Sequence, residues 1–138
     1  MVVTEKLSLS TDGDCHVIDV TGHVAQHVAE CGMADGIVTV FAAGTTVGVG
    51  IIEYEPGLLK DLEEAMERLV PREIPYQHNI LNNDDNGHAH TQATLMGQSL
   101  VVPFTDKQPT LGTWQRIVVV DFDSRPRTRE VVIQMMGE

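Results

Sequence analysis

Three of the six histidines of this chain, His78, His88 and His90, lie within one polar stretch of thirteen residues. Neutral imidazole is the commonest protein ligand for zinc and related ions, and it also transfers protons near neutral pH. The stretch therefore predicts a divalent metal site, with zinc as the first candidate, or an acid–base site built from the same groups. A solvated loop with incidental histidines is the alternative that the local sequence leaves open.

The geometry of the pair His88 and His90 depends on the element that carries it. On a strand, residues i and i+2 point to the same face and could bind one ion. On a helix they diverge by about 160°, so that only one of them serves well. His78 could add a ligand from across the loop, while Asp84 and Asp85 could act as ligands or orient an imidazole.

Two glutamates, Glu53 and Glu55, flank Tyr54 directly before Pro56. At the end of a strand they would share one face and could form a carboxylate pair for a metal or for proton transfer. The alternative is a solvated strand end that places negative charge at the start of a helix, where it is favourable.

Neutral hydrogen-bonding side chains suited to an anionic substrate occur at two further places. Thr113 and Gln115 flank Trp114, the only tryptophan, which could otherwise serve as a core or interface anchor. Thr45 lies in a small polar turn that lacks the lysine of a nucleotide-binding loop. These residues are candidate donors to the phosphate group of a small metabolite.

The composition limits the class of partner. The chain has 138 residues, enough for one domain with a core, and a formal net charge of -11. Such a charge argues against binding to nucleic acid or to a membrane surface, although a local cationic pocket could still hold a small phosphorylated metabolite. Without a signal peptide or a long apolar stretch, and with only two cysteines, we expect a cytoplasmic protein.

Apolar periodicity and turn residues predict an α+β fold in a single domain, 1–138, with mixed or antiparallel β-sandwich-like sheets and two main helices. The main helices are expected at 21–31 and 57–69, and a short one at 88–96. Extended segments are expected at 2–9, 15–20, 36–42, 45–54, 98–104, 114–122 and 129–136.

Five segments, taken in order, resemble the YjbQ family, whose members are often labelled secondary thiamine-phosphate synthases. The segments are 53–62, 76–79, 86–97, 99–103 and the Gly-Thr-Trp-Gln of 112–115. The resemblance implies a homotrimer with a histidine-containing pocket near a subunit boundary, able to hold a metal ion. The activity proposed for the family joins a pyrimidine diphosphate to a thiazole phosphate, giving thiamine phosphate and pyrophosphate.

Residue by residue, His78, His90 and Asp61 match motif positions of the family. Gly44 stands where many members have a histidine, and the usual Asn-Glu-Asn run is replaced around Glu53. A three-histidine site of the common kind is therefore in doubt, and His88 or a glutamate could fill the vacancy.

The leading hypothesis is a metal-dependent enzyme resembling thiamine-phosphate synthase. Its expected ligands are His78, His88 and His90; its catalytic residues Glu53, Asp61 and Asp85; its phosphate donors Thr45, Thr113 and Gln115. Lys60 or Arg116 could add positive charge, but the chain offers few cations for a diphosphate. The alternatives are a trimer that binds a metal or metabolite without catalysis, and a metal-assisted phosphate-ester hydrolase.

Overall fold

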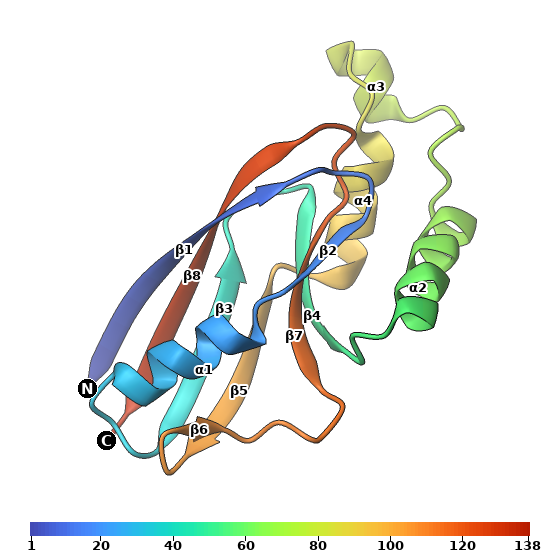
Figure 1. Ribbon diagram of the computed structural model, residues 1–138. Coiled ribbons are helices and arrows are strands. Elements are labelled where there is room, and N and C mark those ends of the chain that lie inside the picture. The colour runs from blue at the N-terminus through green and yellow to red at the C-terminus, as the bar shows by residue number, and fades with distance from the viewer.

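Alternating apolar residues build the larger of two antiparallel sheets in the computed structural model, which describes residues 1–138 (Figure 1). Its strand order is β1–β8–β3–β5–β6. The strands are β1 (Val2–Thr11), β8 (Arg127–Gly137), β3 (Gly36–Ala42), β5 (Ser99–Thr105) and β6 (Gln108–Pro109). One face of this sheet packs into the main core, and neighbouring strands are antiparallel throughout.

The smaller sheet lies between two hydrophobic cores. Its order is β2–β7–β4, and its strands are β2 (His16–Asp19), β7 (Arg116–Asp121) and β4 (Val47–Ile52). The central strand β7 sends Ile117 and Val119 into the main core and Val118 and Val120 into a second core. Burial on both faces explains why β7 is a continuous run of apolar residues rather than an alternating one.

Four helices complete the fold: α1 (Thr21–Glu30), α2 (Pro56–Leu69), α3 (Gln77–Asn82) and α4 (Gly87–Met96). Helix α1 buries Val24 and Val28 in the main core, while α2 and α4 pack over the second core. Glu55 caps α2 by accepting hydrogen bonds from the backbone N–H groups of Gly57 and Leu58, at 2.9 and 2.8 Å. None of these helices is long and apolar enough to cross a membrane.

The prediction of an α+β fold with antiparallel sandwich-like sheets is confirmed, and both main helices are present as α1 and α2. The polar stretch expected to be a loop contains α3, which sequence periodicity could not reveal. This helix is short, and its apolar residues Ile80 and Leu81 are 63% and 78% exposed, so it has no buried face. It ends at Asn83, which adopts the left-handed conformation with φ of 51°.

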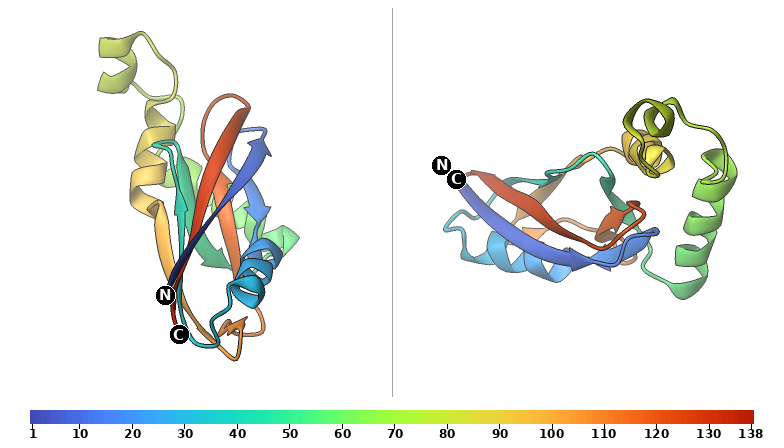
Figure 2. Two further views of the ribbon diagram at one scale, coloured as in Figure 1. Left: turned by 90° about the vertical axis from the view of Figure 1, so that its left-hand side faces the viewer. Right: turned by 90° about the horizontal axis from the view of Figure 1, so that it is seen from above.

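The connections β1–β2, β3–β4 and β7–β8, each of which joins the two sheets, meet at one end of the molecule. The β7–β8 connection bonds to the other two, because Phe122 N–H donates to the Thr46 carbonyl (2.9 Å) and Asp14 N–H to the Asp123 carbonyl (2.7 Å). Gly13, with φ of 77°, packs so closely here that a Cβ atom would lie 2.6 Å from the Asp123 carbonyl oxygen. The two chain termini lie side by side at the opposite end (Figure 2).

Candidate functional site

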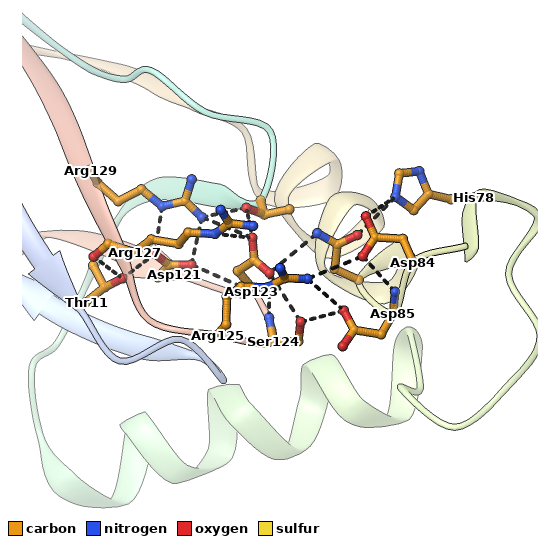
Figure 3. Close-up of polar contacts among 12 residues, drawn as sticks. Thr11, His78, Asp84, Asp85, Asp121, Asp123, Ser124, Arg125, Arg127 and Arg129 are labelled. Carbon is orange, nitrogen blue, oxygen red and sulfur yellow. Dashed lines mark hydrogen bonds and ion pairs between the residues drawn. The ribbon is translucent and has the colours of Figure 1, made fainter. Parts of the chain in front are cut away.

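A buried ion pair anchors the end of the molecule where the connections meet (Figure 3). Arg129, the third residue of β8, points inward and donates to both carboxylate oxygens of Asp121, at 2.7 and 2.9 Å. The Thr11 hydroxyl donates to the same carboxylate, and Arg129 also donates to the Thr46 hydroxyl. The pair therefore ties β1, β7, β8 and the turn directly before β4 together.

A second carboxylate, Asp123, lies in the β7–β8 connection. It accepts hydrogen bonds from the Thr46 hydroxyl at 2.9 Å, from Arg127 Nε at 3.0 Å and from the Ser124 backbone N–H at 2.7 Å. Asn86, at the start of α4, donates to it from 3.4 Å. Asp123 thus links the two sheets to the helix that carries His90.

Both carboxylates are held in the ionised form. Burial alone would raise the pKa of Asp121, but hydrogen bonds from Arg129 and Thr11 outweigh it and lower the pKa below its usual value. Burial likewise opposes ionisation of Asp123, whose pKa is lowered by its bonds to Thr46 and the Ser124 backbone and by the charge of Arg127. The site therefore contains two fixed ion pairs near neutral pH.

A polar hollow of about 280 Å³ opens beside these ion pairs. It is lined by Gly44, Thr45, Thr46, Asn86, His90, Asp123, Arg127 and Arg129, none of them a hydrophobic residue. Arg127 uses only its Nε in hydrogen bonding, and Nη1 of Arg129 makes none. Guanidinium donors are thus left uncommitted at a wall where the carboxylates fix the guanidinium planes.

Gly44 is required by this packing. A Cβ atom at this position would lie 2.9 Å from Nη1 of Arg129 and 2.9 Å from Cγ1 of Val47. Any side chain here, a histidine included, would press on the guanidinium group. The position at which many YjbQ proteins carry a histidine is therefore closed to one in this chain, unless Arg129 shifts.

Two histidines meet at the rim of the hollow. The ring centroids of His78 and His90 lie 4.4 Å apart, with an angle of 53° between the ring planes. His78 Nε2 lies 3.0 Å from Asn86 Oδ1 and 3.6 Å from a carboxylate oxygen of Asp84. Asn86 therefore connects His78 to Asp123, and His90 itself lines the hollow.

Asp85 supports the loop beneath this pair. Its carboxylate accepts a hydrogen bond from the Ser124 hydroxyl at 2.7 Å and one from Arg125 at 3.4 Å. The Ser124 bond is the main reason that the pKa of Asp85 is lowered. These contacts join the loop before α4 to the β7–β8 connection, so Asp85 fixes the loop between the two helices that carry His78 and His90.

The structure does not bring the three predicted histidines together within a single chain. His88 and His90 both lie in α4. Residues i and i+2 of a helix are separated by a rotation of about 200° around the helix axis, which is about 160° in the other direction, so His88 faces away from the hollow. It lines another cavity and has a pKa lowered mainly by burial. No three histidine, cysteine, aspartate or glutamate side chains come together anywhere in the chain to hold a metal ion.

The other predicted residues are spread over the surface. Glu53 and Thr113 line a separate hollow of about 470 Å³ beside Trp114, which is 72% exposed and is not a core residue. The Gln115 side chain accepts a hydrogen bond from the Gly112 backbone within its own loop. Thr45 is the one predicted phosphate donor that lines the hollow with His90.

Two further predictions also place residues away from His90. Asp61 and Lys60 lie on the exposed face of α2, and neither lines any of the hollows. Arg116 pairs with Asp19 at 2.7 Å beside Trp114. The cations that do line the hollow, Arg127 and Arg129, were not among the predicted residues.

The fold and the site define an α+β protein in which two antiparallel sheets carry, at one end, a polar hollow lined by histidine and arginine. A family model described as "UPF0047 protein YjbQ-like" matches residues 5–138. The chain belongs to this family, as its sequence motifs predicted.

Relatives and solved structures agree with this membership. A UPF0047 protein of Archaeoglobus fulgidus is 43% identical over 131 residues, which are 95% of this chain and 99% of the relative. One of Methanothermobacter thermautotrophicus is 35% identical, with 99% and 94% covered. The crystal structure of a YbjQ-like protein of unknown function from Sulfolobus solfataricus matches with a TM-score of 0.95 at 30% identity, covering 100% and 99%.

Proposed function

We propose that the hollow beside His90 binds the phosphate or diphosphate group of a small metabolite. The observation that carries the proposal is the set of uncommitted guanidinium donors of Arg127 and Arg129 at a wall without hydrophobic residues. Planar guanidinium groups match phosphate oxygens with two parallel hydrogen bonds, and the bound carboxylates keep both groups in place. Thr45 adds a neutral donor.

The histidine pair supplies proton transfer in this proposal. His90 lines the hollow, and His78 lies against it and is held by Asn86. Imidazole is suited to giving and taking a proton near neutral pH, provided that it reaches the reacting oxygen. His90 is accordingly the proposed acid that protonates the oxygen of a leaving phosphate group, with His78 sharing the charge.

The reaction that the family resemblance favours is a transfer resembling thiamine-phosphate synthesis. The ring nitrogen of the thiazole phosphate forms a C–N bond to the methylene carbon of the pyrimidine diphosphate. The C–O bond to the diphosphate breaks, and pyrophosphate leaves with the electron pair and takes its proton from His90. Arg127 and Arg129 stabilise the charge that develops on the departing group.

The side chains of a single chain do not supply a complete set of ligands for a metal ion at this site. His78 and His90 are the only predicted histidine ligands that meet, and although a carboxylate oxygen of Asp84 lies 3.6 Å from His78 Nε2, these side chains do not form a group of three able to hold a metal ion. A zinc site normally has at least three protein ligands. In this proposal arginine therefore balances the negative charge of the phosphate, and binding of zinc by the two histidines stays a prediction.

Calorimetric titration with pyrophosphate, without added metal, tests the binding. We expect Arg127→Gln to weaken binding about tenfold, as loss of one charge-assisted contact does. Arg125→Gln is the matched control, because Arg125 contacts Asp84 and Asp85 and does not line the hollow. Equal affinities for the two variants, or no binding by the unaltered protein, would contradict the proposal.

Product analysis then identifies the reaction. Thiamine phosphate and pyrophosphate formed from the two substrates would establish the transferase. Release of phosphate or pyrophosphate without coupling would favour a hydrolase, in which water replaces the thiazole. Tight binding of pyrophosphate with neither product would leave a protein that binds a phosphorylated metabolite without turning it over.

A further inference from the structure

A second cavity, of about 170 Å³, lies on the opposite side of α4 from the proposed site. Helix α2, helix α4 and the turn before β2 enclose it. Its lining consists of Asp14, Cys15, Glu63, Met66, Glu67, Arg72, His88, Gln92 and Phe122. None of these residues lines the hollow beside His90, so any ligand bound here is independent of the proposed phosphate site.

His88 is the unusual residue of this cavity. Its side chain is buried, at 4% exposure, and neither ring nitrogen has a hydrogen-bond partner in the chain. Nδ1 of His88 is the only fully buried side-chain nitrogen or oxygen of the protein without a partner. Buried polar groups in folded proteins are almost always bonded, so a buried imidazole without a partner at a cavity wall points to a ligand. Because Nδ1 has no accessible surface, such a ligand reaches the ring through Nε2.

The remaining polar groups of the cavity indicate which hydrogen-bonding groups the ligand carries. Arg72 is already paired with Asp14 at 2.7 Å, and its backbone N–H donates to Glu67. Gln92 donates its Nε2 to the carbonyls of Val70 and Met66, at 3.2 and 3.4 Å, which leaves its Oε1 as a free acceptor.

Two further acceptors are free at the wall. Glu63 has no hydrogen bond or ion pair within the chain, and a neutral imidazole such as that of His88 keeps one acceptor nitrogen. The uncommitted groups, Glu63, Gln92 and His88, are thus three acceptors, one of them a carboxylate. Their complement is a cation that carries several hydrogen-bond donors.

We propose that this cavity binds a small primary amine as its ammonium ion. The three N–H donors of the ammonium group match the free acceptors of Glu63, Gln92 and His88, and a short alkyl chain packs against Met66 and Phe122. The volume accommodates about five or six non-hydrogen atoms, at about 30 Å³ for each water-sized group. No three histidine, cysteine, aspartate or glutamate side chains come together at this cavity to hold a metal ion.

The probe is n-butylammonium, with n-butanol as its uncharged counterpart of equal size, titrated into the full chain and followed by amide and imidazole NMR shifts. We expect saturable binding of the ammonium ion that moves the ring signals of His88 and leaves those of His23 and His27 in place. Butanol should bind about fivefold more weakly, which is the upper end of the effect of a partly exposed ion pair.

Two glutamates on the same helix provide matched variants. Glu63→Gln removes the free carboxylate, while Glu64→Gln removes a neighbouring charge on α2 that does not line the cavity. We expect the first variant to weaken butylammonium binding about fivefold and the second to leave it unchanged. Both positions are exposed, so both variants should fold.

Three results of these titrations would overturn the proposal. They are the absence of saturable binding, equal affinities for butanol and butylammonium, and equal losses in the two glutamate variants. Displacement of butylammonium by potassium chloride more than by sodium chloride would reassign the cavity to an inorganic cation and equally reject the amine. Pyrophosphate should leave butylammonium binding intact, which keeps this test separate from that of the phosphate site.

Discussion

Asp121 shows how a single buried charge can serve both stability and a site. Its carboxylate is inaccessible to solvent, yet it is saturated by two bonds from Arg129, one from Thr11 and one from the Asp123 backbone N–H. Such a pair adds little stability compared with apolar residues, but loss of one partner leaves the other charge uncompensated. The charges that cost free energy to bury therefore lie at the end of the sandwich, beside the hollow.

The lowered pKa values of Asp121 and Asp123 predict sensitivity to acid. A carboxyl group whose folded pKa is depressed contributes stability above its unfolded pKa, about 3.9, and that contribution is lost as the pH falls through the folded pKa. We therefore expect the free energy of unfolding, measured with urea, to fall steeply below about pH 4.

Asp121→Asn provides the matched variant for this acid test. At neutral pH it should lower the free energy of unfolding by about 3 kcal/mol, because Arg129 loses its partner. Its stability should then depend less on pH in the acid range than that of the unaltered protein. A parallel decline of the two proteins would show that other carboxylates govern acid unfolding.

The histidine pair gives a second prediction at the residue scale. Two imidazoles without a third protein ligand should hold zinc weakly, so purified protein is expected to lose its zinc on dialysis against a chelator. The His78→Ala/His90→Ala double variant should show no zinc binding on titration, while His16→Ala keeps the affinity of the unaltered protein. One firmly held equivalent of zinc per chain would mean that ligands from outside this chain complete the site.

At the scale of elements, α4 lies unusually close to β4, and glycine makes this possible. A Cβ atom at Gly48 would lie 2.8 to 3.1 Å from Sδ, Cβ and Cγ of Met96, the last residue of α4. At Gly50 the only close atom would be the terminal methyl of the same side chain. The position of α4, and hence that of His90, depends on the first of these glycines.

Gly48→Ala should therefore destabilise the protein by about 1–3 kcal/mol, as overpacking does. Gly50→Ala should cost less, because the end of a methionine side chain moves easily. Thermal unfolding of both variants measures the difference, and pyrophosphate binding shows whether α4 has shifted. A larger loss of stability at position 50 would contradict this account of the contact.

Most elements could be predicted from the sequence because their apolar periods are strong, as in β3, β8 and α2. Helix α3 could not, because it is only 6 residues long and has no buried face. The histidines His78 and His90 were foreseen by residue type. Their separation from His88 follows from the helix predicted at 88–96, whose period places residues i and i+2 on different faces.

Arg129 was missed, although the sequence contains a signal for it. The alternation of Val131, Ile133 and Met135 toward the core, continued backwards by one step, places residue 129 on the buried face of β8. A charged residue at such a position requires a partner, but which one cannot be known from the strand. Asp121 belongs to the other sheet, and only the folding of the β7–β8 connection brings the two side chains together.

For the whole molecule, the outer face of the larger sheet suggests assembly. Ile37, Phe41, Val101 and Met136 are exposed on β3, β5 and β8, and the pairing Ile37–Met136 makes them neighbours on one surface. Exposed apolar patches of this kind mark contact surfaces. A homotrimer, which the family resemblance implies, would cover such a face.

Light scattering coupled to gel filtration should therefore give the mass of three chains. Phe41→Asp should shift this mass toward that of one chain, because it places a charge in the contact, while Lys60→Glu, on the exposed face of α2 and away from this sheet, should leave it unchanged. A monomeric mass for the unaltered protein would remove the trimer and any site shared between subunits.

The strand order has one more consequence, which concerns synthesis. Strand β8 lies between β1 and β3, and β7 lies between β2 and β4, so each sheet needs an inner strand that comes from the last quarter of the domain. Until those residues leave the ribosome, the earlier strands have no neighbour to bond with, apart from β3 with β5 and β6. The nascent chain therefore stays unfolded, with its apolar strands accessible to chaperones, until the final strand emerges.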